Sequence, residues 1–125
     1  MRSRFAAALV TVLLATACEQ HPTDAFDEVF VHIDGAEFVL ENHTPRTVYY
    51  FAVDRERLAL IDWTPCNHPA FCEGVPVGDE RRLSTSDVQG MTPDTRAVVF
   101  YTWHLIPTAS GGYRVRMRNE LVVAL

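Results

Sequence analysis

The chain has 125 residues, of which 48% are hydrophobic and 22% are charged, and its formal net charge at pH 7 is −5. This length is typical of one domain, and a domain of this size can bury a genuine core. The negative charge argues against nucleic acid and against anionic lipid headgroups as partners.

An arginine-flanked apolar run opens the chain. Arg2 and Arg4 precede an uncharged stretch over residues 5–16, and small residues lead from its end to Cys18. A charged start, a short apolar run and small residues at a cleavage point are typical of an export signal. The run is too short for a membrane-spanning helix, which needs about 20 apolar residues. We therefore expect residues 1–17 to be a signal helix that is cleaved.

The end of this leader, Leu14-Ala15-Thr16-Ala17-Cys18, resembles the lipobox of bacterial lipoproteins. In that family the Cys is lipidated and becomes the first mature residue. The family usually has Leu three residues before the Cys, whereas this chain has Ala15 there and Leu14 one position earlier. The alternative is an ordinary secretory leader that is cut after Ala17 and leaves Cys18 as a free thiol.

The resemblance implies a protein held in the cell envelope by fatty acyl chains on Cys18, with the membrane as its first partner. Glu19 after the lipidated residue implies sorting to the periplasmic side of the outer membrane, if the host has two membranes. Removal of residues 1–17 from the 125 leaves 108 residues, and the loss of Arg2 and Arg4 lowers the net charge from −5 to −7. Residues 18–28 are polar and contain Pro22, so we predict a flexible tether there and a single domain over 29–125.

The first half of the domain has the period-two pattern of strands. Residues 29–33 alternate, and Asp34-Gly35 predicts a tight hairpin because both residues tolerate positive φ in a two-residue turn. Residues 37–41 predict a return strand with one buried and one solvated face. A turn is expected over 42–46, where Pro45 cannot donate to a ladder. Residues 47–53 are β-branched and aromatic on both faces, which predicts a central strand.

The second half is less regular until its last two strands. Residues 58–63 fit either a strand or a short helical turn, and the prolines and glycines of 65–78 predict a loop. A short charged strand over 81–85 is typical of a sheet edge. The clearest strand covers 96–106, and a long strand is expected to return over 113–125.

These patterns predict an all-β domain of about six or seven strands, most simply a small immunoglobulin-like β-sandwich. The Cys…Trp…Cys spacing of true immunoglobulin domains is absent, because Cys66 and Cys72 flank a loop and do not join two sheets. The fold class is thus an analogy, with a small β-barrel as the alternative, and it does not fix the function.

Cys66 and Cys72 predict a disulfide, since an even pair remains after the anchor Cys in an exported protein. One alternative is a metal site that uses Cys66, His68 and Cys72 with a distant fourth ligand, although this spacing is uncommon for structural zinc. A redox-active pair is a further alternative, but the Cys-x-x-Cys spacing is missing. We therefore predict a structural disulfide, with no metal and no cofactor.

No nucleophile elbow, phosphate-binding loop or dinucleotide turn is present, so the sequence predicts no catalytic residue. The residues best suited to contact a partner are Trp63, His68 and Phe71, in and beside the disulfide loop. An exposed apolar edge there would contact an envelope protein or a glycan. The alternative for Trp63 is that it packs under the loop.

Three hypotheses of function follow. The first is a lipid-anchored, non-enzymatic binding or accessory module of the cell envelope. The second is an inhibitor-like or structural domain that docks a protein partner through an edge strand or the Cys66–Cys72 loop. The third is an enzyme or metal carrier that uses His68 with the cysteines. The sequence leaves the oligomeric state open.

Overall fold

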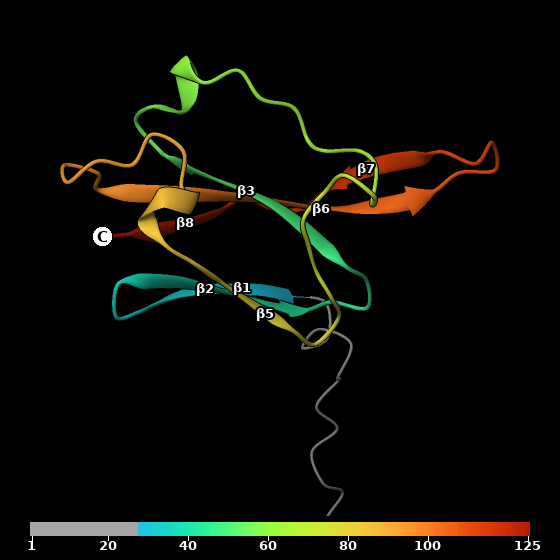
Figure 1. Cartoon of the computed structure of the whole chain (residues 1–125), viewed down its shortest axis with the longest axis horizontal. Coiled ribbons are helices and arrows are strands. Elements are labelled where there is room, and N and C mark those ends of the chain that lie inside the picture. Colours follow the sequence, from blue (N-terminus) through green and yellow to red (C-terminus); the bar gives the residue numbers. More distant parts are fainter. Residues whose placement is uncertain (1–27) are drawn as a thin grey trace, which may run out of the picture.

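The computed structural model describes residues 28–125, so the predicted leader, the lipidation site and nearly all of the predicted tether lie outside the described residues. Within them, eight strands form two sheets that lie one above the other, as Figure 1 shows. The prediction of an all-β, sandwich-like domain is confirmed. Eight strands stand where six or seven were expected, and the only helical segments among the described residues are two short 3-10 helices.

The smaller sheet has the order β1-β2-β5, and its strands are β1 (Glu28–Asp34), β2 (Glu37–His43) and β5 (Glu80–Leu83). The larger sheet has the order β4-β3-β6-β7, and β8 also pairs with β6. Its strands are β3 (Val48–Asp54), β4 (Gly74–Val75), β6 (Ala97–Pro107), β7 (Tyr113–Met117) and β8 (Leu121–Ala124). The 3-10 helices are η1 (Leu58–Leu60), as the helical alternative for this stretch predicted, and η2 (Thr85–Asp87).

The predicted first hairpin is confirmed, but its turn differs in detail. β1 begins at Glu28, which the sequence placed in the tether, and pairs antiparallel with β2 from Glu28↔His43 to Asp34↔Glu37. The two turn residues are Gly35 and Ala36, and only Gly35 has a positive φ, of 63°. The expectation of positive φ at both turn residues is therefore wrong. A single glycine at the first turn position is the requirement of a type II′ turn.

The expectation that Val39 lies on a solvated face of β2 is also wrong, because Val39 is completely buried. β2 is the central strand, and Val39 lies directly opposite Arg82 of β5. Arg82 forms ion pairs with Asp34 at 3.0 Å, on β1, and with Glu37 at 3.6 Å, on β2 itself. To reach β1 from β5, the arginine side chain has to cross β2, so its alkyl stem covers apolar surface there.

The main core lies between the two sheets and follows from the alternation of β2 and β6. Phe38 and Leu40 point inward from β2, and Val98 and Phe100 point inward from β6. The rings of Phe38 and Phe100 are 5.5 Å apart. The inward members of this core are Val29, Phe38, Leu40, Val48, Ala52, Val75, Leu83, Val88, Val98 and Phe100.

The predicted loop 65–78 contains the short strand β4, which the sequence did not indicate. Gly74 lies opposite Tyr49, and Val75 lies opposite Val48. A Cβ atom at position 74 would lie only 2.5 Å from Cγ2 of Thr47. Glycine therefore lets this backbone approach β3 closely enough to pair with it.

The predicted long strand 113–125 is interrupted after Met117. Met117 lies opposite Trp103, and Leu121 lies opposite Phe100. The chain therefore has one residue more between Met117 and Leu121 than β6 has between Phe100 and Trp103. The extra residue is a β-bulge, and it reverses which alternate residues face the core. Val115 of β7 packs on the outer face of the larger sheet, whereas Leu121 of β8 packs against the main core.

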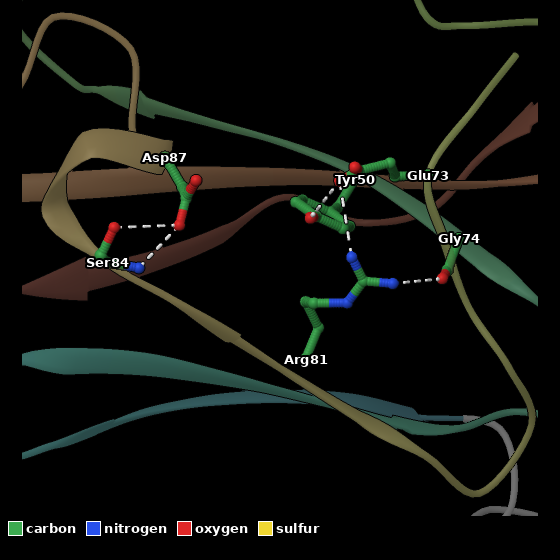
Figure 2. Close-up of polar contacts among 6 residues, drawn as sticks. All are labelled: Tyr50, Glu73, Gly74, Arg81, Ser84 and Asp87. Atoms are coloured by element: carbon green, nitrogen blue, oxygen red, sulfur yellow. Dashed lines mark hydrogen bonds and ion pairs between the residues drawn. The ribbon is translucent and has the colours of Figure 1, made fainter.

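Arg81 closes one open edge between the two sheets (Figure 2). It lies opposite Leu40, on the inward face of β5, where its Nη2 donates to the carbonyl of Gly74 at 3.0 Å and its Nη1 lies 3.4 Å from the Glu73 carboxylate. Tyr50 of β3 donates to the same carboxylate at 3.5 Å. Burial raises the pKa of the Tyr50 phenol above its ordinary value, with Arg81 opposing this shift and Glu73 adding to it.

Asn42 ties the two sheets together at the end of β2. Its Nδ2 donates to the carbonyls of Arg46 and Val75, both at 2.8 Å. Its Oδ1 accepts from the backbone N–H of Thr44 at 2.9 Å and lies 2.7 Å from the Thr44 hydroxyl. The side chain uses its donors and acceptor fully, which explains how an amide that is only 1% exposed is tolerated in the interior.

Candidate binding surface

The outer face of the larger sheet carries a second cluster of aromatic side chains. Tyr49 lies opposite Trp103, and Phe51 lies opposite Tyr101, because these residues alternate outward on β3 and β6. We call Tyr49, Phe51, Trp63, Tyr101 and Trp103 the aromatic cluster. Burial is the main cause of raised phenol pKa values at Tyr49 and Tyr101 in this cluster.

Trp63, a predicted contact residue, lies within the aromatic cluster. Its ring stacks on Phe51 with centroids 4.4 Å apart and an interplanar angle of 16°. Its centroid is 5.0 Å from that of Tyr101 and 6.0 Å from that of Trp103. The side chain is half-buried against these rings and the half-cystines, which favours the alternative of a packed Trp63 over an exposed one.

The disulfide loop, residues 66–72, covers part of this cluster. The Cys66–Cys72 disulfide predicted from the sequence is confirmed, with its Cα atoms 5.7 Å apart. Both half-cystines pack against the cluster, and Nε1 of Trp103 donates to the carbonyl of Cys66 at 2.9 Å. Because the two sulfurs are bonded to each other, neither is available as the thiolate ligand that the metal alternative requires.

The structure brings together two of the predicted contact residues and adds a third. The His68 ring lies 5.3 Å from Phe71 and 5.5 Å from Tyr113, measured between ring centroids. Phe71 is 84% exposed and Tyr113 is 37% exposed. We call His68, Phe71 and Tyr113 the loop patch. The sequence did not indicate Tyr113, since its position depends on where the β6–β7 hairpin lies relative to the disulfide loop.

Hydrogen bonds within the disulfide loop hold the His68 ring in place. Its Nδ1 accepts from the backbone N–H of Ala70 at 3.1 Å, and its carbonyl accepts from the N–H of Phe71 at 3.0 Å. With Nδ1 acting as an acceptor, the neutral imidazole carries its proton on Nε2. The loop patch therefore presents one aromatic hydrocarbon ring, one phenol and one ring N–H donor, a combination suited to recognition.

Residues 28–125 contain neither a candidate metal site nor a membrane-spanning helix. No group of three or more His, Cys, Asp or Glu side chains in this part of the chain is placed to hold a metal ion. None of the helices in the same residues is long and apolar enough to cross a membrane.

Comparisons of the chain with protein-family models, with curated proteins and with solved structures gave no match.

Proposed function

We propose that this protein is a lipid-anchored, non-enzymatic component of the cell envelope whose immunoglobulin-like domain binds another envelope component through the loop patch. The anchor is Cys18, on the strength of the lipobox-like leader that precedes it. The leader and the domain have separate roles in this proposal. The first determines where the protein resides, and the second determines what it contacts there.

The exposure of Phe71 on a rigid loop is the observation that supports a binding role most directly. A phenylalanine that is 84% exposed gains nothing from the core, so its burial by a partner remains available as binding energy. The loop beneath it is closed by the disulfide and tied to β6 through Trp103. Because the loop is already ordered, it loses little conformational entropy when a partner binds.

The chemistry of the loop patch fits an apolar protein surface or the flat face of a sugar ring. Phe71 and Tyr113 supply ring faces, and the phenol of Tyr113 and the imidazole of His68 supply hydrogen bonds. Sorting to the periplasmic side of the outer membrane, which Glu19 implies, would place the patch among proteins and cell-wall glycans.

Phe71→Ala tests the patch, and Leu60→Ala is its matched control, because Leu60 is 85% exposed and lies outside the loop. We expect envelope material captured by the wild-type protein to be lost with Phe71→Ala and kept with Leu60→Ala. Treatment of the captured material with a protease, or with a cell-wall hydrolase, then identifies the partner as protein or glycan. Equal capture by both variants would show that the loop patch is not the binding surface.

Incorporation of labelled palmitate tests the anchor separately. We expect the label in the wild-type chain and its loss in Cys18→Ser, with mature protein beginning at residue 18. A wild-type chain that carries no label and retains its leader would exclude the lipoprotein assignment, whatever the binding result.

A second candidate, a structural or inhibitor-like domain that docks through an edge strand, is favoured by one observation. Within the described residues, the outer edge of β1 and that of β7 and β8 pair with no other strand. Unpaired edges of this kind are the usual template for strand addition.

A further inference from the structure

The two sides of the sandwich differ in how their edge strands are protected. On the side that we call the closed side, the larger sheet ends in β4, which has only two residues. The smaller sheet ends there in β5, whose four residues include Glu80, Arg81 and Arg82. Arg81 also bridges from β5 to the carbonyl of Gly74, on β4. Short edges and charged edges both prevent pairing with further strands.

On the opposite side, which we call the open side, the protection is partial: β7 carries Arg114 and Arg116, and β1 has acidic residues only at its ends, Glu28 and Asp34. The open side is formed by β1 in the smaller sheet and by β7 and β8 in the larger one, and β1 contacts β8. No charged residue and no proline occurs in residues 29–33 of β1 or in residues 121–125. Four large hydrophobic residues along these two segments are between 44% and 51% exposed: Phe30, Ile33, Val122 and Leu125.

We propose that the open side binds the same side of a second copy of this chain, which gives a symmetric dimer in which both sheets continue from one copy into the other. A two-fold axis along the normal of the sheets places β1 against β1 and β8 against β8. Both pairs are then antiparallel, the more stable arrangement of strands.

A second copy fits the open side better than an extended peptide does. The open side presents two strand edges, one in each sheet, and β1 and β8 lie close enough to contact each other. A single peptide strand can pair with only one of these edges. A second copy presents both edges at the same spacing, so it satisfies both at once.

The side chains of β1 select the register of the β1 pair. Residues directly opposite each other share a face, so Phe30, which alternates outward with Glu28 and His32, has to meet an outward residue of the second copy. Pairing centred on Val31 would oppose Glu28 to Asp34 of the second copy, and two like charges repel. Pairing centred on Phe30 opposes Glu28 to His32 of the second copy and stacks the two Phe30 rings.

Disulfide cross-linking tests the dimer and its register together. In the full chain with Cys18→Ser, Phe30→Cys places two thiols opposite each other across the axis, at a Cα separation that a disulfide accepts. We expect most of this variant to run as a covalent dimer on a non-reducing gel. Leu60→Cys is the matched control, because it is more exposed but lies away from the open side. Equal cross-linking of the two variants would overturn the proposal.

The mass of the full-length protein in solution provides the second measurement. We expect sedimentation equilibrium of the Cys18→Ser chain to give twice the mass of one chain, and Phe30→Lys with Val122→Lys to halve that value. Val77→Lys, at a residue that is 56% exposed in the β4–β5 connection, should leave the mass unchanged. Circular dichroism shows whether each variant remains folded. A folded wild-type chain that stays monomeric at all concentrations would refute the dimer.

The loop patch and the open side share only β7, whose first residue is Tyr113. Phe71 lies outside the open side, so Phe71→Ala should keep the doubled mass even where it abolishes partner capture. A monomeric wild-type chain that still captures envelope material would refute the dimer alone.

Discussion

The indole N–H of Trp103 donates a 2.9 Å hydrogen bond to the backbone carbonyl of Cys66 and so fastens the disulfide loop to the middle of β6. Trp103 is only 2% exposed, and its ring belongs to the aromatic cluster that the loop covers. One side chain therefore serves both the packing of the outer face and the placement of the proposed contact residues.

Trp103→Phe should loosen the disulfide loop while it keeps most of the aromatic packing. The variant loses the indole donor and leaves the Cys66 carbonyl without this partner, which should lower the free energy of unfolding by about 1–3 kcal/mol. Denaturant unfolding measures this change. Hydrogen exchange at residues 66–72 should become faster than in the wild type, and unchanged exchange there would contradict the role given to Trp103.

The Cys66→Ser, Cys72→Ser double variant should remain folded but less stable. The disulfide closes a short loop, so its loss should cost about 2 kcal/mol in the chain-entropy description. Urea unfolding of the oxidised protein and of the double variant gives the difference directly. Complete unfolding of the variant would show that the loop carries far more of the stability than its length implies.

Asn42→Asp should be among the most destabilising single substitutions at a polar residue. The carboxylate cannot donate to the carbonyls of Arg46 and Val75, and a buried charge would face both oxygens. We expect a loss of at least about 3 kcal/mol in the free energy of unfolding. Arg46→Ala is the control, since the network uses only the backbone carbonyl of Arg46 and its exposed side chain should matter little. Similar losses for the two variants would argue against the network.

Deletion of Asn119 should reverse the orientation of β8. Without the extra residue, Leu121 and Val123 would turn away from the main core, and Val122 and Ala124 would turn toward it. Loss of these contacts should lower the free energy of unfolding by about 2–3 kcal/mol. Insertion of one glycine after Ser110, in the exposed β6–β7 hairpin loop, should change stability much less, because a surface loop accommodates an added residue. A fully stable deletion variant would show that the bulge is dispensable.

Alkaline pH should destabilise the protein partly through Tyr50. Burial raises the pKa of this phenol in the folded state above 10.0, so the folded protein holds the proton to higher pH than the unfolded chain does. The contribution of the protonated Tyr50 phenol to the free energy of unfolding is therefore complete below about pH 10. It is lost as the pH rises through 10 and then through the pKa of Tyr50 in the folded state. Unfolding measured at about pH 8 and at about pH 11 should show a smaller loss for Tyr50→Phe than for the wild type. Equal losses would mean that Tyr50 does not contribute.

Most of the strands could be predicted from the sequence because their side chains alternate. The faces of β6 appear directly in the sequence, and the charges of β5 indicated a sheet edge. β4 could not be predicted, because its two residues become a strand only through pairing with Val48 and Tyr49. The bulge was missed for a related reason, since it is defined by the register of β7 and β8 against β6.

The disulfide loop of the candidate site could be predicted from the sequence, but the residues that the fold brings next to this loop could not. The sequence places His68 and Phe71 within the disulfide loop, and compartment and spacing indicated the disulfide itself. Tyr113 is far from this loop along the chain and joins it only because the β6–β7 hairpin passes beside it. Trp63 could have been either exposed or packed, and only the positions of Phe51, Tyr101 and Trp103 distinguished these two cases.

The sequence by itself determined the all-β class, the first hairpin and the Cys66–Cys72 pairing, because alternation, turn residues and cysteine count act over a few neighbouring residues. Tertiary structure alone decided which strands other than β5 are edges, which face the disulfide loop covers and which aromatic side chains stay exposed. These features depend on contacts between segments far apart in the chain. Local sequence patterns contain no information about which of these segments come together.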